Sequence, residues 1–225
     1  MKALIFDSGS LISFSMNGIL EELKKLKKSF NGKFLITKDV KREVIDKPLT
    51  IKRFELEALK IKQLLDEKIL EMPDAIGVND NQINQKTREF IDVANSSFVA
   101  HGKEIDIIDS GEASCLALGS ILNEKKIETL IAVDERTLRL LVEKPENLKN
   151  ILEGKLHTGI KLNKQDFNLF KQFKIIRSSE LIYVAYKKGF VNLKNGNVLD
   201  ALLWAMKFKG CSISGDEIRE IKSIK

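Results

Sequence analysis

Short apolar runs recur along the chain, and each leads through polar residues into a helical pattern. Lys2–Phe6 is such a run, and the same order returns at Phe34–Ile36 and Leu130–Val133. Apolar runs of this length, each followed by a helix cap, are typical of buried parallel strands. Ile105–Ile108 is a further apolar run, and Lys174–Ile176 is a candidate for the last strand. The alternation predicts an α/β fold.

Helical periodicity fills most of the remaining chain. It covers Leu11–Phe30 and Val40–Leu70, which Gly18 and Pro48 interrupt. Further helices are expected at Ser110–Leu122, Glu135–Val142, Ser179–Lys188 and Val198–Phe208.

Two segments fit this alternation poorly, at about 66–103 and about 144–173. The first is polar around Asn79–Gln82, and the second is rich in Lys and Asn. Each lies between segments that the α/β pattern explains without it, so we interpret both as insertions. The prediction is one domain over residues 1–225 that carries two elaborations.

Composition excludes several classes of protein. Of 225 residues, 43% are hydrophobic, which is too many for a disordered chain, and no apolar run approaches the roughly 18 residues of a membrane span. The opening run reaches Asp7 too early for a signal peptide, so we expect a cytoplasmic protein without a membrane partner. The two cysteines and two histidines have no zinc-site spacing.

Acidic residues follow the expected strands. Asp7 follows the first run, Asp109 and Glu112 follow Ile105–Ile108, and Asp134 with Glu135 follows the run ending at Val133. Each could simply cap a helix, and Asp109 with Glu112 has capping-box spacing. The carboxyl ends of parallel strands share one edge, however, so these acids and Glu43 would collect like charges there. Such a cluster is costly without a cation such as Mg²⁺ or Mn²⁺, which predicts a metal site for phosphoryl chemistry.

Other routes to phosphate chemistry find no support. The chain has neither GxxxxGK[ST] nor GxGxxG, so no nucleotide cofactor is indicated. Gly210–Ser214 begins like a serine-hydrolase elbow but ends in Ser. Ile5–Asp7 resembles the start of haloacid-dehalogenase-like phosphatases, but Gly9 stands where they have a second Asp.

The acidic segments resemble those of PIN-domain nucleases. Ala3–Ile12 is similar to the first strand with its acid, and Ile36–Val44 to the segment with the second acid, Glu43. Ile108–Ala113 resembles the Asp-x-Gly-Glu-Ala form found in archaeal and bacterial members related to VapC-type toxins. Ile131–Arg136 resembles the Asp-Asp-Arg segment, with Glu135 in place of the second Asp. The C-terminal part agrees at Glu180–Phe190, Leu199–Phe208 and Gly210–Ser214.

This resemblance implies a three-layer α/β/α fold with a parallel sheet and a metal-dependent ribonuclease, expected to be an endonuclease. Water activated by Mg²⁺ or Mn²⁺ would attack the phosphodiester. The implied catalytic acids are Asp7, Glu43, Glu112 and Asp134, and the implied metal ligands are Asp7, Glu112, Asp134 and Asp109. Two alternatives stay open: a catalytically silent PIN-fold module that binds RNA or acts as a scaffold, and the phosphatase.

The net charge of +6 suits a polyanionic partner. Four cations stand beside the acids in sequence and are the candidate RNA-binding residues: Lys41, Arg42, Arg136 and Arg139. No run of aromatic residues interleaved with basic ones is present, so the sequence offers no support for base stacking. The resemblance also implies a homodimer and, for toxin members, a cognate antitoxin. The two elaborations favour an RNA-processing role over a toxin.

Overall fold

The computed structural model describes residues 1–194 and 196–224, and its centre is a four-stranded parallel sheet. The strands are β1 (Lys2–Phe6), β2 (Gly32–Leu35), β5 (Glu128–Ala132) and β7 (Ile175–Ile176), in the spatial order β2-β1-β5-β7. All neighbouring pairs are parallel. The expected α/β class with a parallel sheet is confirmed, and all four strands end at the same edge.

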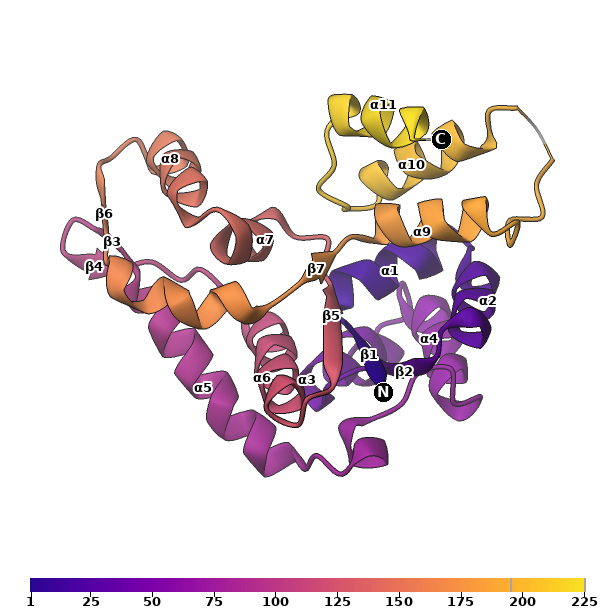
Figure 1. Ribbon diagram of the computed structural model, residues 1–225, viewed down its shortest axis with the longest axis horizontal. Coiled ribbons are helices and arrows are strands. Elements are labelled where there is room, and N and C mark those ends of the chain that lie inside the picture. The colour runs from indigo at the N-terminus through magenta and orange to yellow at the C-terminus, as the bar shows by residue number, and fades with distance from the viewer. Residues whose placement is uncertain (195, 225) are drawn as a thin grey trace.

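The strand order places helices on both faces of the sheet. The chain crosses from β1 to β2 in one direction and from β2 to β5 in the other, and right-handed crossovers then put the two connections on opposite faces. On one side, α6 (Ser110–Glu124) packs against β1 and β5. On the other, α1 (Ser8–Met16) and α2 (Leu20–Ser29) pack against α9 (Ser178–Lys187), as Figure 1 shows. This arrangement is consistent with three layers.

The two long helical patterns are broken where the sequence placed its interruptions. Gly18, with φ of +70°, separates α1 from α2, because that left-handed conformation is accessible to glycine at little cost. The pattern at 40–70 contains four separate elements: α3 (Lys38–Lys41), a π-helix (Arg42–Asp46), a 3₁₀ turn (Pro48–Thr50) and α4 (Glu55–Asp66).

The strand expected at Ile105–Ile108 is absent, although its side chains are buried as expected at two positions. Ile107 and Ile108 are each 6% exposed, and Ile105 donates its N–H to the carbonyl of Phe98 at 3.0 Å, but residues 105–108 form no strand. The side chain of Asn95 accepts the N–H of Ile107 at 2.9 Å, which satisfies backbone that a sheet would otherwise pair. Asp109 therefore follows an irregular apolar segment, not a strand.

The two elaborations meet in a second sheet that the sequence did not predict. It is antiparallel with the order β4-β3-β6, and β3 (Phe98–Ala100) and β4 (Lys103–Glu104) come from around the first elaboration. The third strand, β6 (Ile160–Leu162), comes from the second elaboration and pairs with β3. Phe90 also lies 5.5 Å from Phe173 between ring centroids. Each elaboration thus supplies the partner that the other lacks.

The remaining helices surround these two sheets. In Figure 1, α10 and α11 lie on the side of the main sheet away from the second sheet. One cluster of buried apolar side chains extends through both sheets and their helices. No helix in residues 1–194 and 196–224 is long and apolar enough to cross a membrane. The further helices are a 3₁₀ turn (Pro73–Ile76), α5 (Asp80–Ser96), α7 (Arg136–Glu143), α8 (Pro145–Leu156), a 3₁₀ segment (Lys164–Gln172), α10 (Val198–Phe208) and α11 (Gly215–Ser223).

Candidate functional site

Asp7 lies at the carboxyl end of the central strand β1 and is only 4% exposed. It is the N-cap of α1, and its Oδ2 accepts the N–H of Gly9 at 3.2 Å. Its Oδ1 is buried and has no hydrogen-bond partner in the described structure. A buried carboxylate oxygen without a donor is costly, so this atom is a candidate ligand for a cation.

Asp109 and Glu112 form the capping box that their spacing predicted. Asp109 Oδ1 accepts the N–H of Glu112 at 2.9 Å, and Glu112 Oε2 accepts the N–H of Asp109 at 3.1 Å. Asp109 is exposed, whereas Glu112 is 8% exposed. Capping does not exclude a second role, because each carboxylate keeps one oxygen outside the two capping bonds.

The side chain of Glu43 extends from the π-helix (Arg42–Asp46) to the N-terminus of α6. A Cβ atom added at Gly111 would lie 2.7 and 2.8 Å from the two carboxylate oxygens of Glu43, so only glycine permits this approach. Ser8, at the start of α1, is close enough to the Glu43 side chain to lower the pKa of its carboxyl, against the larger effect of burial. Single turns of π-helix are frequent at functional sites. Gly111 belongs to the Asp-x-Gly-Glu-Ala segment, but nothing in that pattern predicted its contact with Glu43.

Repulsion and burial change the acidity of three carboxyls in this group. Burial, with the nearby charges of Asp109 and Glu43, raises the pKa of Asp7 to about 7. Burial, with the charges of Asp7 and Asp109, raises the pKa of Glu112 to about 9. The pKa of Glu43 is raised as well, first by burial and then by Asp109. Asp7, Glu43, Asp109 and Glu112 therefore act on one another, and we call them the acid cluster.

Asp134, the fourth expected acid, has a different environment. Its Oδ1 accepts the N–H of Ser178 at 2.8 Å, and its Oδ2 accepts the hydroxyls of Ser178 at 2.6 Å and Ser13 at 2.8 Å. Asp134 thereby ties the end of β5 to α1 and α9. Nothing in the sequence pointed to either serine. The role of Asp134 as a metal ligand stays a prediction.

Glu135, at the position where the family has a second Asp, caps α7. Its carboxylate accepts the backbone N–H of Thr137 and of Leu138. Its charge also contributes to raising the pKa of Glu112, after burial and the charges of Asp7 and Asp109. Glu135 is therefore a cap at the border of the acid cluster.

The acid cluster has features that suit a cation but does not form a complete metal site in the described residues. Among residues 1–194 and 196–224, no three acid, His or Cys side chains already converge on one point as a complete metal site. Two local features nevertheless suit a cation: the partnerless Oδ1 of Asp7, and the glycine that lets Glu43 approach. Carboxylate oxygens are the ligands that Mg²⁺ and Mn²⁺ prefer. The acid cluster thus has the ligand chemistry that a hard divalent cation needs, although its side chains do not converge on one point in the described residues.

The four candidate RNA-binding cations differ in availability. Arg42 is beside Glu43, but it pairs with Asp39 at 2.9 Å and its side chain remains 60% exposed. Lys41 pairs with Asp46 at 2.6 Å. Arg139 donates to the carbonyl of Ser212 at 3.3 Å and is half-buried. Arg136, in the first turn of α7, is exposed. Arg42 and Arg136 are thus the two best placed to meet a polyanion.

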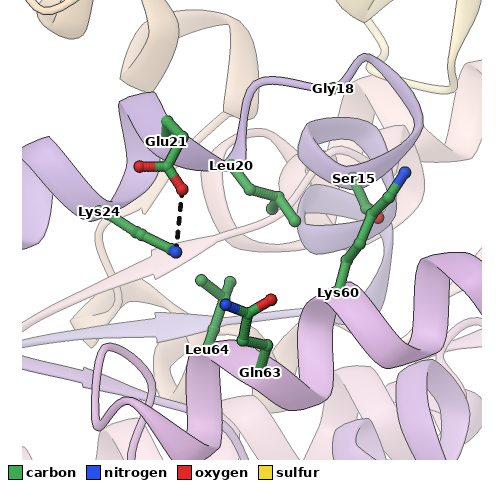
Figure 2. A pocket seen from close by; sticks show the side chains of 8 residues that line it. All are labelled: Ser15, Gly18, Leu20, Glu21, Lys24, Lys60, Gln63 and Leu64. Atoms are coloured by element: carbon green, nitrogen blue, oxygen red, sulfur yellow. Dashed lines mark ion pairs between the residues drawn. The ribbon is translucent and has the colours of Figure 1, made fainter.

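A pocket lies away from the acid cluster, between the α1–α2 turn and α4 (Figure 2). Its volume is about 260 Å³, and Lys24 projects into it beside Glu21. Hydrogen bonds to Glu21 and Glu67 raise the pKa of Lys24, and both ion pairs measure 2.9 Å. Two carboxylates therefore neutralise this lysine, and the pocket has no feature of an anion site.

Replacing Gly111 by Ala is expected to weaken Mn²⁺ binding by about tenfold to a hundredfold, the usual cost of losing a group that orients a site. The added Cβ would displace the carboxylate of Glu43. Stability should hold or rise slightly, because Ala is the better helix former by up to about 1 kcal/mol. Titration calorimetry and thermal melting measure the two effects. Gly154→Ala, on a helix with open space around it, is the control; equal Mn²⁺ affinity of both variants would exclude a role for Glu43.

Comparison with known proteins adds no assignment. No family model, no curated protein and no solved structure matches the chain. The resemblance to PIN-domain nucleases therefore stays a prediction from the residues quoted above. The features that bear on function are the parallel sheet and the acid cluster at its carboxyl edge.

Proposed function

We propose that the protein is a metal-dependent ribonuclease with a PIN-like fold, which hydrolyses RNA phosphodiester bonds at the acid cluster. The observation that carries the proposal is Asp7, a buried carboxylate at the end of the central strand with one partnerless oxygen, surrounded by other acids. Such a group is unfavourable by itself and becomes favourable when a divalent cation is bound. The four-stranded parallel sheet supports the site's position, since ligands bind at this edge in open α/β sheets.

Asp7, Glu43 and Glu112 would hold the cation, and Asp109 would orient Glu112 through the capping box. When bound, Mg²⁺ or Mn²⁺ supplies an activated water and neutralises charge that develops on the phosphate. Glu112, whose pKa is about 9, holds a proton at neutral pH without the cation and would release it on binding. Glu43 has room at the start of α6 because Gly111 has no side chain.

The surrounding residues would position the substrate. Arg42 directly precedes Glu43, Arg136 directly follows Glu135, and both are exposed, so they can meet the phosphates that flank the scissile one. Asp134 holds the ends of β5, α1 and α9 together beneath the site through Ser13 and Ser178. In this proposal Asp134 is a positioning residue.

The test is cleavage of an end-labelled RNA, and of a DNA of the same sequence, in Mg²⁺, Mn²⁺ or EDTA. Metal-dependent cleavage is expected, and Asp7→Asn should lower its rate by more than about 100-fold, because even residues that only support a ligand cost about 10- to 100-fold. The exposed Asp74→Asn is the matched control.

Three outcomes would contradict the proposal. Equal cleavage by Asp7→Asn and wild type would remove the acid cluster from the chemistry. Absence of cleavage by well-folded wild type on several RNAs would favour the silent binding module. Release of phosphate from p-nitrophenyl phosphate, lost in Asp7→Asn, would favour the phosphatase.

A further inference from the structure

An apolar groove lies directly beside the acid cluster. It has a volume of about 460 Å³ and lies between α1 and the segment that leads into α4. Ile12 and Met16 line it from one face of α1 and are 37% and 47% exposed. Ile51 and Phe54 line the opposite side and are 38% and 42% exposed. Four large apolar side chains that face solvent together, with no covering element in the described chain, indicate a binding surface.

The groove is continuous with the proposed catalytic site, because Glu43 belongs to both. Glu43 lines the groove, and its carboxylate is also the one that lies against Gly111 at the start of α6. Val44, the next residue of the π-helix, lines the groove as well. A molecule held at the acid cluster by a phosphate would therefore extend into the groove with its neighbouring atoms.

Two cations border the groove and suit a polyanion. Lys47 and Arg53 both line it, and neither has an ion pair in residues 1–194 and 196–224. The guanidinium of Arg53 lies 5.4 Å from the centroid of the Phe54 ring. The remaining acid of the lining, Glu57, is within 4.0 Å of Lys60. The groove thus combines a half-exposed aromatic side chain, a guanidinium next to its ring, and a lysine without an ion pair among the described residues.

This combination fits an unpaired nucleobase better than a protein partner. Unpaired bases stack on aromatic rings and on Arg guanidinium planes, while adjacent phosphates take up the cationic groups. A second copy of the chain or a folded protein would need about 800 Å² on each partner, and four half-buried side chains do not supply it. An apolar peptide as the ligand would leave unexplained why the groove shares Glu43 with the acid cluster and is lined by Lys47 and Arg53.

We propose that this groove is a nucleobase-binding subsite, which holds an unpaired base of an RNA next to the scissile phosphate by stacking it on Phe54. Lys47 and Arg53 contact the flanking phosphates. The inference rests on the proposed ribonuclease function and adds the place where an unpaired base next to the scissile phosphate would bind. The sequence showed no aromatic and basic run because two of the four apolar residues come from α1 and two from the turn before α4.

The test uses two fluorescein-labelled oligoribonucleotides of equal length, one with its bases and one abasic, which retains the sugar-phosphate backbone. Fluorescence anisotropy measures their affinity in Ca²⁺, which binds carboxylates and takes the place of Mg²⁺. Phe54→Ala is expected to weaken binding of the base-containing RNA by about tenfold, the usual loss of one stacked base. Binding of the abasic RNA should not change.

Leu59→Ala is the matched control, because Leu59 is a 49% exposed residue of α4 that lies outside the groove. It should bind both RNAs as wild type does. Lys47→Ala should weaken binding of both RNAs, since it would lose a phosphate contact. Thermal melting of each variant checks that all four proteins fold equally well.

Several results would overturn the subsite. One is that Phe54→Ala binds the base-containing RNA as tightly as Leu59→Ala does, and another is that Phe54→Ala loses equal affinity for both RNAs. The others are that the wild type binds the two RNAs equally tightly, or that it binds neither. Conversion of a wild-type dimer into a monomer by Phe54→Ala, seen in sedimentation, would assign the groove to a second copy instead.

Cleavage by the same preparations in Mn²⁺ separates this proposal from the proposed function. A raised KM with unchanged kcat in Phe54→Ala supports both. Metal-dependent cleavage that Phe54→Ala leaves unaffected overturns the groove alone. Base-dependent binding through Phe54 without any cleavage overturns the ribonuclease alone.

Discussion

Asp7→Asn is expected to stabilise the metal-free protein at pH 8 by about 2 kcal/mol, although it should abolish activity. Each pKa unit is worth about 1.4 kcal/mol, and burial raises the pKa of Asp7 from its ordinary value to about 7. The ionised carboxylate therefore destabilises the fold at pH 8, and a neutral amide removes that cost. Part of the gain is offset because the amide places an N–H group among buried atoms. In a chain of this size, thermal melting should rise by roughly 5 °C.

The same pKa values predict how the stability of the wild type depends on pH. Between about pH 4 and pH 7 the folded protein keeps a proton on Asp7 that the unfolded chain releases. The free energy of unfolding therefore falls as the pH rises through this window. Glu112, with a pKa of about 9, extends the fall to about pH 9. Asp7→Asn should flatten the first part of this profile.

Melting in EDTA from pH 5 to pH 9, repeated with Mn²⁺, checks these expectations. Mn²⁺ should stabilise the wild type most at high pH, where the cluster is ionised, and should stabilise Asp7→Asn much less. Asp74→Asn, an exposed substitution, should follow the wild type. A flat profile for the wild type, or a lower melting temperature for Asp7→Asn at pH 8, would show that Asp7 is not under electrostatic strain.

Asp134→Ala is expected to lower the free energy of unfolding by about 3 kcal/mol, because it removes three buried hydrogen bonds that each contribute about 1 kcal/mol or more. The bonds come from two serines on different helices, so the loss would loosen the end of β5 from both α1 and α9. Chemical denaturation measures the change. Ser178→Ala should cost less, since it leaves the backbone N–H of residue 178 and the hydroxyl of Ser13 on the carboxylate.

Measuring both the stability and the Mn²⁺ affinity of Asp134→Ala distinguishes a positioning role of Asp134 from a role as a metal ligand. Asp216→Ala, on the exposed first turn of α11, is the control and should leave stability within about 0.5 kcal/mol. If Asp134→Ala kept its stability and instead lost Mn²⁺ affinity, Asp134 would be a ligand and its bonds to the serines would be dispensable. Loss of stability with retained Mn²⁺ affinity is the expected result.

The fold class follows from the local pattern of the chain. Short apolar runs such as Lys2–Phe6 became strands because neighbouring residues alone decide whether a segment is apolar and extended. The interruptions at Gly18 and Pro48 also separate helices as expected. Ile105–Ile108 shows the limit of this reasoning. The burial of this segment was predictable from its own apolar residues. The sequence did not show that the side chain of Asn95 accepts the N–H of Ile107, a group that a neighbouring strand would otherwise bind.

Part of the candidate site was also within reach of the sequence. Acids that follow parallel strands lie at one edge, so the position of Asp7 was predictable, whereas the acids of α6 follow an irregular segment and only the structure places them beside Asp7. The capping box of Asp109 and Glu112 was readable from a spacing of three residues.

What only the tertiary structure decided involves residues distant in the chain. Ser13 lies 121 residues from Asp134, and Ser178 lies 44 residues from it. The second sheet joins two insertions, and the groove joins α1 to the segment before α4. Sequence periodicity determines which side of an element is buried, but it does not determine which element covers that side. The sequence alone therefore determined the four strands of the parallel sheet, most of the helices around it and the edge where Asp7 lies, while packing decided the second sheet and what each acid contacts.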